Sequence, residues 1–171
     1  MTTNPTIRRA ADEPPTIRRA ASSDTSELAE LAGELGYPTT SGELARRLAN
    51  LPPGDDVWVA ELDGRVAGWV HAALRLSLVA EPHVEVLGLV VRAGCRGSGV
   101  GRLLMAAAED SARAHGVALV RLRSGSHRDG AHAFYRALGY QEAKRQLVFV
   151  REVDSDVDPG VPAPAPAGPR R

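Results

Sequence analysis

The sequence predicts an α/β fold with a mixed sheet, and the order of its segments indicates this class. Hairpin-forming segments come first, joined by the strong turn signal Asp63-Gly64, and strand patterns then alternate with helix patterns after residue 83. The chain has 171 residues, of which 43% are hydrophobic, so it is long and apolar enough for one packed domain. A wholly disordered chain is therefore excluded.

The predicted elements follow one another along the chain in a regular order. A short strand over 16–20 leads to a helix that Ser23 or Asp24 can cap and that ends near Gly36, and a second helix opens at Ser41. Alternating apolar residues then mark strands, and apolar residues at helical spacing mark two more helices. These further elements are strands over 57–62, 65–76, 83–91, 117–122 and 147–153 and helices over 103–112 and 130–138.

Both ends of the chain differ in composition from its middle. Residues 154–171 are rich in Pro and Ala, which favours an extended, solvated tail. The segment PTIRRAA at 5–11 returns at 15–21, and its first copy is either an extension or a strand at a sheet edge. We therefore expect a flexible extension over 1–15, one folded domain over 16–153 and a disordered tail over 154–171.

Charge and cysteine content exclude several functions. The 21 basic and 21 acidic residues balance, which argues against a general binder of nucleic acids or membrane surfaces. The single cysteine, Cys95, excludes an internal disulfide and fits a reducing compartment. The sequence shows neither a secretory signal nor an apolar run near the ~20 residues that span a bilayer. We expect a cytoplasmic protein.

A glycine-rich turn between an apolar strand and a helix is the most informative feature. Gly97, Gly99 and Gly101 stand where the helix begins, and the first backbone N–H groups of a helix have no intrahelical partner. Glycines leave room for an anion to approach those N–H groups. The turn therefore predicts a cradle for a phosphate or a pyrophosphate.

Two nucleotide-binding motifs fit this turn poorly. A P-loop has a Lys followed by Ser or Thr after its last glycine, where this chain has Arg102-Leu103. The dinucleotide motif is G-x-G-x-x-G, whereas the glycines here read G-x-G-x-G, and the next strand carries Arg121 and Arg123 in place of an acidic residue. The segment Arg96-x-x-Gly99-x-Gly101 instead matches the signature (Gln/Arg)-x-x-Gly-x-(Gly/Ala).

A second motif lies one helix and one strand further along the chain. Residues 131–140, AHAFYRALGY, match the pattern A-x-x-(F/L)-Y-x-x-x-G-(F/Y). With these two motifs in this order, the chain from about Thr16 to Val153 resembles the GCN5-related N-acetyltransferase (GNAT) superfamily. The resemblance implies a mixed, splayed sheet of six or seven strands flanked by about four helices, with acetyl-CoA as co-substrate in the opening.

The resemblance also implies which residues hold coenzyme A. The backbone of Leu89, Val90 and Val91 would align the pantetheine arm and the acetyl carbonyl. Arg128 stands where the family often has an Asn that contacts the pantetheine, and Ser124, Ser126 or Arg128 can substitute for it. The pyrophosphate would lie on the amides of Arg96, Gly97, Ser98, Gly99, Val100, Gly101 and Arg102.

Two side chains take catalytic roles by the same resemblance. Tyr135 stands where the family usually places the general acid that protonates the departing thiolate, and a phenol of pKa about 10 suits that donor. Glu85 stands where some members carry a glutamate general base, acting directly or through a water. Strict alternation along the strand predicts that Glu85, Leu87 and Leu89 share one face.

The acceptor side of the site is less defined by these patterns. Glu34 and Tyr37, between the first two helices, stand where family members commonly contact acceptors, and His132 can line the acceptor site. His127 and His132 are five residues apart without further ligands at metal spacing, so no metal is predicted. A homodimer is compatible with exposed edge strands.

Three functions stay open at this level. The first is an acetyl-CoA-dependent acyltransferase that moves an acetyl group directly to a primary amine. Its acceptor is either a small molecule, such as an antibiotic, an amino sugar or a metabolite, or a protein lysine or N-terminus. The second is a non-catalytic acyl-CoA-binding regulatory module, and the third is a nicotinamide-dependent oxidoreductase.

Overall fold

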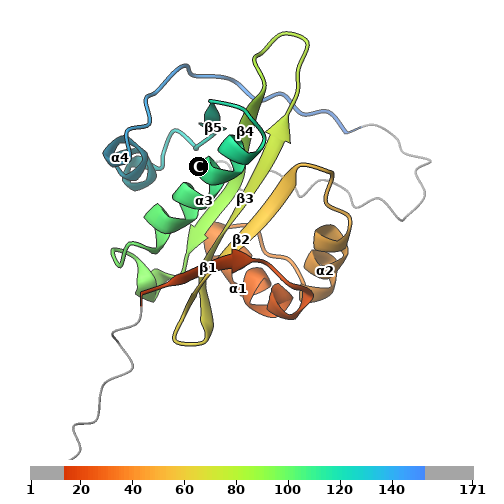
Figure 1. Ribbon diagram of the computed structural model, residues 1–171, viewed down its shortest axis with the longest axis vertical. Coiled ribbons are helices and arrows are strands. Elements are labelled where there is room, and N and C mark those ends of the chain that lie inside the picture. The colour runs from red at the N-terminus through yellow and green to blue at the C-terminus, as the bar shows by residue number, and fades with distance from the viewer. Residues whose placement is uncertain (1–13, 153–171) are drawn as a thin grey trace, which may run out of the picture. The chain divides into compact units, whose positions relative to one another are not determined.

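The computed structural model describes residues 14–152 (Figure 1). Internal contacts divide the chain into two parts, Met1–Arg123 and Ser124–Arg171. Of the predicted extension over 1–15, only Pro14 and Pro15 are among the described residues, and the predicted tail over 154–171 lies wholly outside them.

The elements match most of the predicted order. In the first part the strands are β1 (Thr16–Arg19), β2 (Asp55–Leu62), β3 (Arg65–Arg75), β4 (His83–Val91) and β5 (Val120–Leu122). The helices of that part are η1 (Ser22–Asp24), α1 (Thr25–Leu35), α2 (Ser41–Ala49), η2 (Ala93–Cys95) and α3 (Val100–Ala114). The second part holds α4 (Asp129–Ala137). The strand predicted over 83–91 has its predicted bounds.

The strands form a mixed sheet, which confirms the predicted fold class. Its order is β1-β2-β3-β4-β5, with antiparallel neighbours from β1 to β4 and a parallel pair between β4 and β5. The parallel pairing runs only from Val84↔Val120 to Val86↔Leu122. In the part of the chain that the structure describes, no strand continues this pairing along β4 from Leu87 to Val91, so β4 and β5 part there as the resemblance implies.

The sheet has five strands over the described residues, where six or seven were predicted. The strand predicted over 147–153 is wrong for its described portion, because residues 147–152 adopt no regular structure. Leu147, Val148, Phe149 and Val150 are each at least 77% exposed. An apolar, β-branched run favours a strand, but the strand forms only where a partner takes up its backbone hydrogen bonds.

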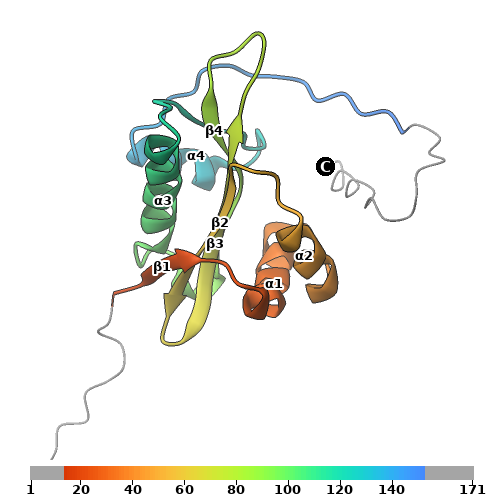
Figure 2. The same cartoon turned by 45° about the vertical axis from the view of Figure 1, so that its right-hand side comes forward.

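Helices cover both faces of the sheet (Figure 2). On one face, Leu28 and Leu31 of α1 are buried against Val59, Val66 and Val90 of three successive strands. On the other face, α3 turns its buried side toward β2, β3 and β4, with Val100, Leu104, Met105 and Ala108 at helical spacing. Each apolar face of the sheet is thus removed from water by a helix, which is the main source of stability for such a layered fold.

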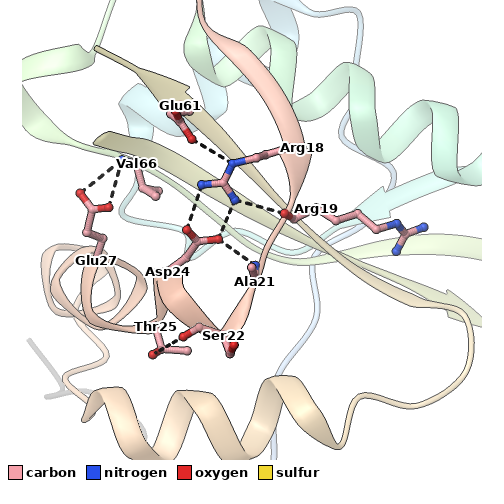
Figure 3. A network of polar contacts seen from close by, with 9 residues as sticks. All are labelled: Arg18, Arg19, Ala21, Ser22, Asp24, Thr25, Glu27, Glu61 and Val66. Atoms are coloured by element: carbon pink, nitrogen blue, oxygen red, sulfur yellow. Dashed lines mark hydrogen bonds and ion pairs between the residues drawn. The ribbon is translucent and has the colours of Figure 1, made fainter. Parts of the chain in front are cut away.

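A polar network fixes β1 to the start of α1 (Figure 3). Asp24 accepts hydrogen bonds from Arg18 Nη1 at 2.7 Å, from Arg18 Nη2 at 2.9 Å and from the backbone N–H of Ala21 at 2.7 Å. Arg18 also donates through Nε to Glu61 of β2 at 2.9 Å. One guanidinium therefore joins two strands to the first helix.

A β-bulge interrupts β4 at Leu87. His71 pairs with Gly88, and the next residue of β3, Ala72, pairs with Val86, so Leu87 is left without a partner on β3. An extra residue in one strand shifts the alternation of side chains beyond it. The bulge lies at the point where the pairing of β4 with β5 ends.

The bulge makes the predicted alternation along this strand wrong. Trp69 packs against the α1 cluster, so Ala73, four residues further along β3, faces the same side, and Glu85 is its partner on β4. Leu89 pairs with Val70, which faces the α3 side. Glu85 and Leu89 therefore lie on opposite faces of the sheet, and Glu85 faces the side of α1 and α2.

Candidate functional site

The glycine turn has the backbone conformation expected of an anion cradle. Gly97 and Gly99 adopt φ values of 81° and 87°, in the left-handed region that favours glycine. Gly99 is the N-cap of α3, and no side chain among the described residues caps this helix. Arg96 Nε donates to the carbonyl of Val91 at 3.3 Å, which folds its side chain back onto the end of β4. Because no described side chain caps the helix, the first backbone N–H groups of α3 are left for another acceptor.

The end of β4 that is not paired with β5 precedes this turn. Leu89, Val90 and Val91 lie beyond the last residue that pairs with β5, and the turn follows Val91 after η2. Backbone groups on an unpaired strand edge can bind an extended chain that carries amides. A strand edge of this kind followed by an anion cradle would suit an extended amide chain that ends in a pyrophosphate.

Acidic side chains of α1 hold the segment after β4 in place. Glu34 accepts a hydrogen bond from the backbone N–H of Ala93 at 3.0 Å, so its carboxylate contacts the segment before the turn. Arg92 donates from Nε and Nη2 to the carbonyl of Val66, each at 3.2 Å, and from Nη1 to Glu30 at 3.4 Å. Sequence reasoning missed Arg92. The available signal was the spacing of Glu30 and Glu34, which are four residues apart and so share one face of α1. Tyr37 is exposed near the end of α1.

Glu85 is buried on β4 and has a charged partner. Its side chain is only 10% exposed, and its Oε1 lies 3.2 Å from Nε of Arg123, just after β5. The guanidinium of Arg123 is itself largely exposed. The predicted base therefore faces the α1 and α2 side as part of an ion pair.

A second buried carboxylate on the same face was missed by sequence reasoning. Asp55 of β2 is bonded through Oδ2 to Nε2 of His71 and through Oδ1 to Nη1 of Arg75, each at 3.1 Å. Burial lowers the pKa of His71, and the bond to Asp55 only partly offsets this effect. The available signal was His71 and Arg75, four residues apart in the largely apolar segment that forms β3. That pattern does not reveal that their shared partner, Asp55, lies on β2.

In the second part of the chain, Tyr135 of α4 belongs to an aromatic cluster that includes a residue just after this helix. Its ring meets Phe134 and Tyr140 edge-on, with ring centroids at 5.2 Å and 6.2 Å. Burial raises the pKa of Tyr135, while the nearby charge of Arg128 acts to lower it. The phenol is therefore protonated at neutral pH and can act as a proton donor. His132 is partly buried on the same helix.

Over residues 14–152 there is no group of three His, Cys, Asp or Glu side chains placed to hold a metal ion. None of the helices described there has the length and apolar character needed to cross a membrane.

Known proteins show the same organisation. The sequence model of the Acetyltransferase (GNAT) family matches residues 23–140. The aminoglycoside N(6')-acetyltransferase type 1 of Stenotrophomonas maltophilia is 31% identical over 141 residues, which cover 79% of this chain and 92% of that protein. The aminoalkylphosphonate N-acetyltransferase of Salmonella typhimurium is 30% identical over 145 residues, which cover 80% of this chain and 93% of that one.

Solved structures agree on the fold. The aminoglycoside 6'-N-acetyltransferase AAC(6')-Ig from Acinetobacter haemolyticus superposes with a TM-score of 0.72 at 21% identity, over 81% of this chain and 99% of that one. AAC(6')-Iy, solved with a bisubstrate analogue of coenzyme A and acetylneamine, gives a TM-score of 0.72 at 22% identity. The match covers 82% of this chain and 100% of that one. With the glycine turn, the parted strands and the family match together, the chain belongs to the acetyltransferase (GNAT) family and is an N-acetyltransferase.

Proposed function

We propose that this N-acetyltransferase uses acetyl-CoA and transfers the acetyl group directly to a primary amine of a small molecule. The observation that carries the cofactor is the left-handed turn at Gly97 and Gly99, which leads into the uncapped start of α3 and follows the part of β4 whose edge is not paired with β5. The pyrophosphate would accept hydrogen bonds from the amides between Arg96 and Arg102, and the pantetheine would pair with Leu89–Val91.

The acceptor class is supported by the relatives that cover most of this chain. Their names specify an aminoglycoside in one case and an aminoalkylphosphonate in the other, and both acceptors are small-molecule amines. A protein lysine or N-terminus is the second candidate.

Tyr135 is the proposed general acid. When the amine nitrogen attacks the thioester carbonyl, a C–N bond forms and the C–S bond breaks, so coenzyme A leaves as a thiolate that needs a proton. The Tyr135 phenol is protonated and half-buried, which suits it to that donation. Glu85 is the base predicted by the resemblance, and its Oε1 is engaged in an ion pair with Arg123.

An acceptor screen tests the function. The full chain is incubated with acetyl-CoA and single amines, including an aminoglycoside, an aminoalkylphosphonate and a lysine peptide, while thiol release and the mass of the acceptor are followed. We expect thiol release with a small-molecule amine that gains one acetyl group. Release with the peptide alone would contradict the small-molecule acceptor, and failure of acetyl-CoA to raise the Tm would contradict the cofactor.

Tyr135→Phe is expected to lower kcat by about a hundredfold while the Kd for acetyl-CoA stays unchanged. Phenylalanine keeps the edge-on ring contacts with Phe134 and Tyr140 but cannot donate a proton. Tyr140→Phe, in the same cluster, is the matched control and should keep wild-type kcat. Equal turnover in the Tyr135 variant and the wild type would remove Tyr135 from the mechanism.

Gly99→Ala is expected to raise the Kd for acetyl-CoA about tenfold, since a left-handed φ costs a non-glycine residue about 1–3 kcal/mol. The strain acts at the N-cap of α3, where the pyrophosphate would bind. Gly94→Ala is the control, because Gly94 has no left-handed φ and a Cβ there meets no atom within 4 Å. Calorimetric titration of acetyl-CoA measures both, and equal affinities would show that the turn does not hold the ligand.

A further inference from the structure

The α1 and α2 face of the sheet carries a polar row at the level of the bulge. Asp55 of β2 and Glu85 of β4 both pair with Ala73 of β3, so the two carboxylates lie in one row across three strands. His71 stands two residues before Ala73, on the same face. Adjacent strands are about 4.8 Å apart, so these side chains border one patch of the sheet.

Asp55 determines which nitrogen of His71 can accept a proton. A carboxylate only accepts hydrogen bonds, so the bond at 3.1 Å requires that Nε2 carries the hydrogen. Nδ1 of the neutral ring therefore keeps its lone pair. The Asp55 side chain is only 3% exposed and is also held by Arg75, whereas that of His71 is 23% exposed and accessible to a small group.

His71 also stands beside the place where the sheet opens. Its partner on β4 is Gly88, next to the bulge at Leu87, and the β4 edge is unpaired from Leu87 onward over the described residues. The imidazole thus belongs to the strand adjacent to the backbone segment that is proposed to hold the thioester. Glu85, on the same face, is engaged by Arg123.

We infer that His71, oriented by Asp55, is the general base that takes a proton from the acceptor ammonium group. This inference rests on the proposed function. Nδ1 accepts the proton, and the neutral amine forms a C–N bond with the acetyl carbon as the C–S bond breaks. Tyr135 supplies a proton to the thiolate, the second proton that the nitrogen loses as the amide forms restores the Tyr135 phenol, and His71 later releases its own proton to water. Asp55 is a positioning residue that keeps Nε2 protonated.

The charged groups around His71 define the expected pH dependence. Those on its face are Asp55, Arg75, His83, Glu85 and Arg123, and Asp56 adds its field from the other face. Burial and Arg75 disfavour the imidazolium, while the two aspartates favour it. Because burial is the larger effect, the base is neutral at neutral pH, and kcat/KM should fall on acidification with an apparent pKa below about 6.5.

The variant His71→Gln distinguishes a role of His71 as general base from a purely structural role. The Gln amide can still donate to Asp55 but cannot bind a proton. We expect kcat/KM to fall about a hundredfold and the acidic limb of its pH profile to disappear, while Tm and the Kd for acetyl-CoA stay near wild type. His83→Gln is the control, because His83 lies on the same face and bonds to the carbonyl of Glu81.

Asp55→Asn tests the positioning role. With the charge removed, protonation of His71 becomes harder, so the acidic limb of kcat/KM should move to lower pH while the affinity for acetyl-CoA is kept. A purely structural Asp55 would lower Tm without moving that limb.

The outcomes distinguish this inference from the proposed function. An active wild type whose His71→Gln variant keeps its rate and pH profile would overturn only the role of His71, above all if Glu85→Gln abolished turnover. A wild type that acetylates no amine would overturn both. Independently, nitrogen NMR of the free protein should show the Nε2–H tautomer at neutral pH, and the other tautomer or an imidazolium would overturn the inference.

Discussion

Gly68→Ala is expected to lower the free energy of unfolding by about 3 kcal/mol, the upper range for overpacking a core. A Cβ at this position would lie 2.6 Å from the carbonyl oxygen of Val90, 3.2 Å from Cα of Val91 and 3.1 Å from Cδ1 of Leu104. Two of these three atoms belong to the backbone of β4, which cannot move without parting from β3. The strand segment proposed to hold the pantetheine would therefore be displaced as well.

Urea denaturation measures this loss, and calorimetry measures its effect on acetyl-CoA binding. Gly42→Ala is the matched control, since Gly42 lies in α2 and a Cβ there meets no atom within 4 Å. Alanine is a better helix former than glycine by up to about 1 kcal/mol, so the control should be neutral or stabilising. Equal stability of the Gly68 variant and the wild type would contradict the close packing of β3 on β4.

Asp24→Asn is expected to cost about 3 kcal/mol at neutral pH, the lower end for breaking a buried ion pair. The lower end applies because Arg18 is 37% exposed and keeps Glu61 as a partner, whereas the Asp24 side chain is 7% exposed (Figure 3). Asn also replaces one of the two oxygens that accept from Arg18 and from the N–H of Ala21.

The pH dependence of stability provides a second test of Asp24. Bonding to Arg18 holds the pKa of Asp24 below its ordinary value, and the backbone N–H of Ala21 acts in the same direction. A lowered carboxyl pKa contributes stability above the unfolded value of about 3.9, and this contribution is lost as the pH falls through the folded pKa. Asp24→Asn should flatten the acid side of the stability curve, whereas Asp63→Asn, at an exposed turn, should leave it unchanged.

Local patterns in the sequence predict the elements on either side of the glycine turn. The apolar run over 83–91 and the glycines at the start of α3 need no distant partner to be recognised. The bulge at Leu87 is different, because it depends on packing between strands. A Cβ at Gly88 would lie 2.8 Å from the ring of Trp69, so this aromatic ring occupies the space above the bulge.

The misplaced strand and the missed side-chain cluster have the same physical origin. Residues 147–150 carry the composition of a strand, but backbone pairing is a property of two segments, and their own sequence does not state whether a partner is present. Asp55 and His71 lie on different strands, and only the register of β2 on β3 brings them together. The sequence places Glu85 on its strand. It does not predict the face of the sheet on which Glu85 lies, because one extra residue in the strand reverses the alternation of side chains beyond it.

The contacts between α1 and the segment before the glycine turn have a thermodynamic consequence. Glu34 binds the N–H of Ala93, and Arg92 joins Glu30 to the carbonyl of Val66, so α1 and the ends of two strands share one set of bonds. A molecule that shifts α1 on binding must therefore change the free energy of the turn. By reciprocity, a ligand that binds at the turn would change the affinity of any molecule that binds at α1 by the same factor.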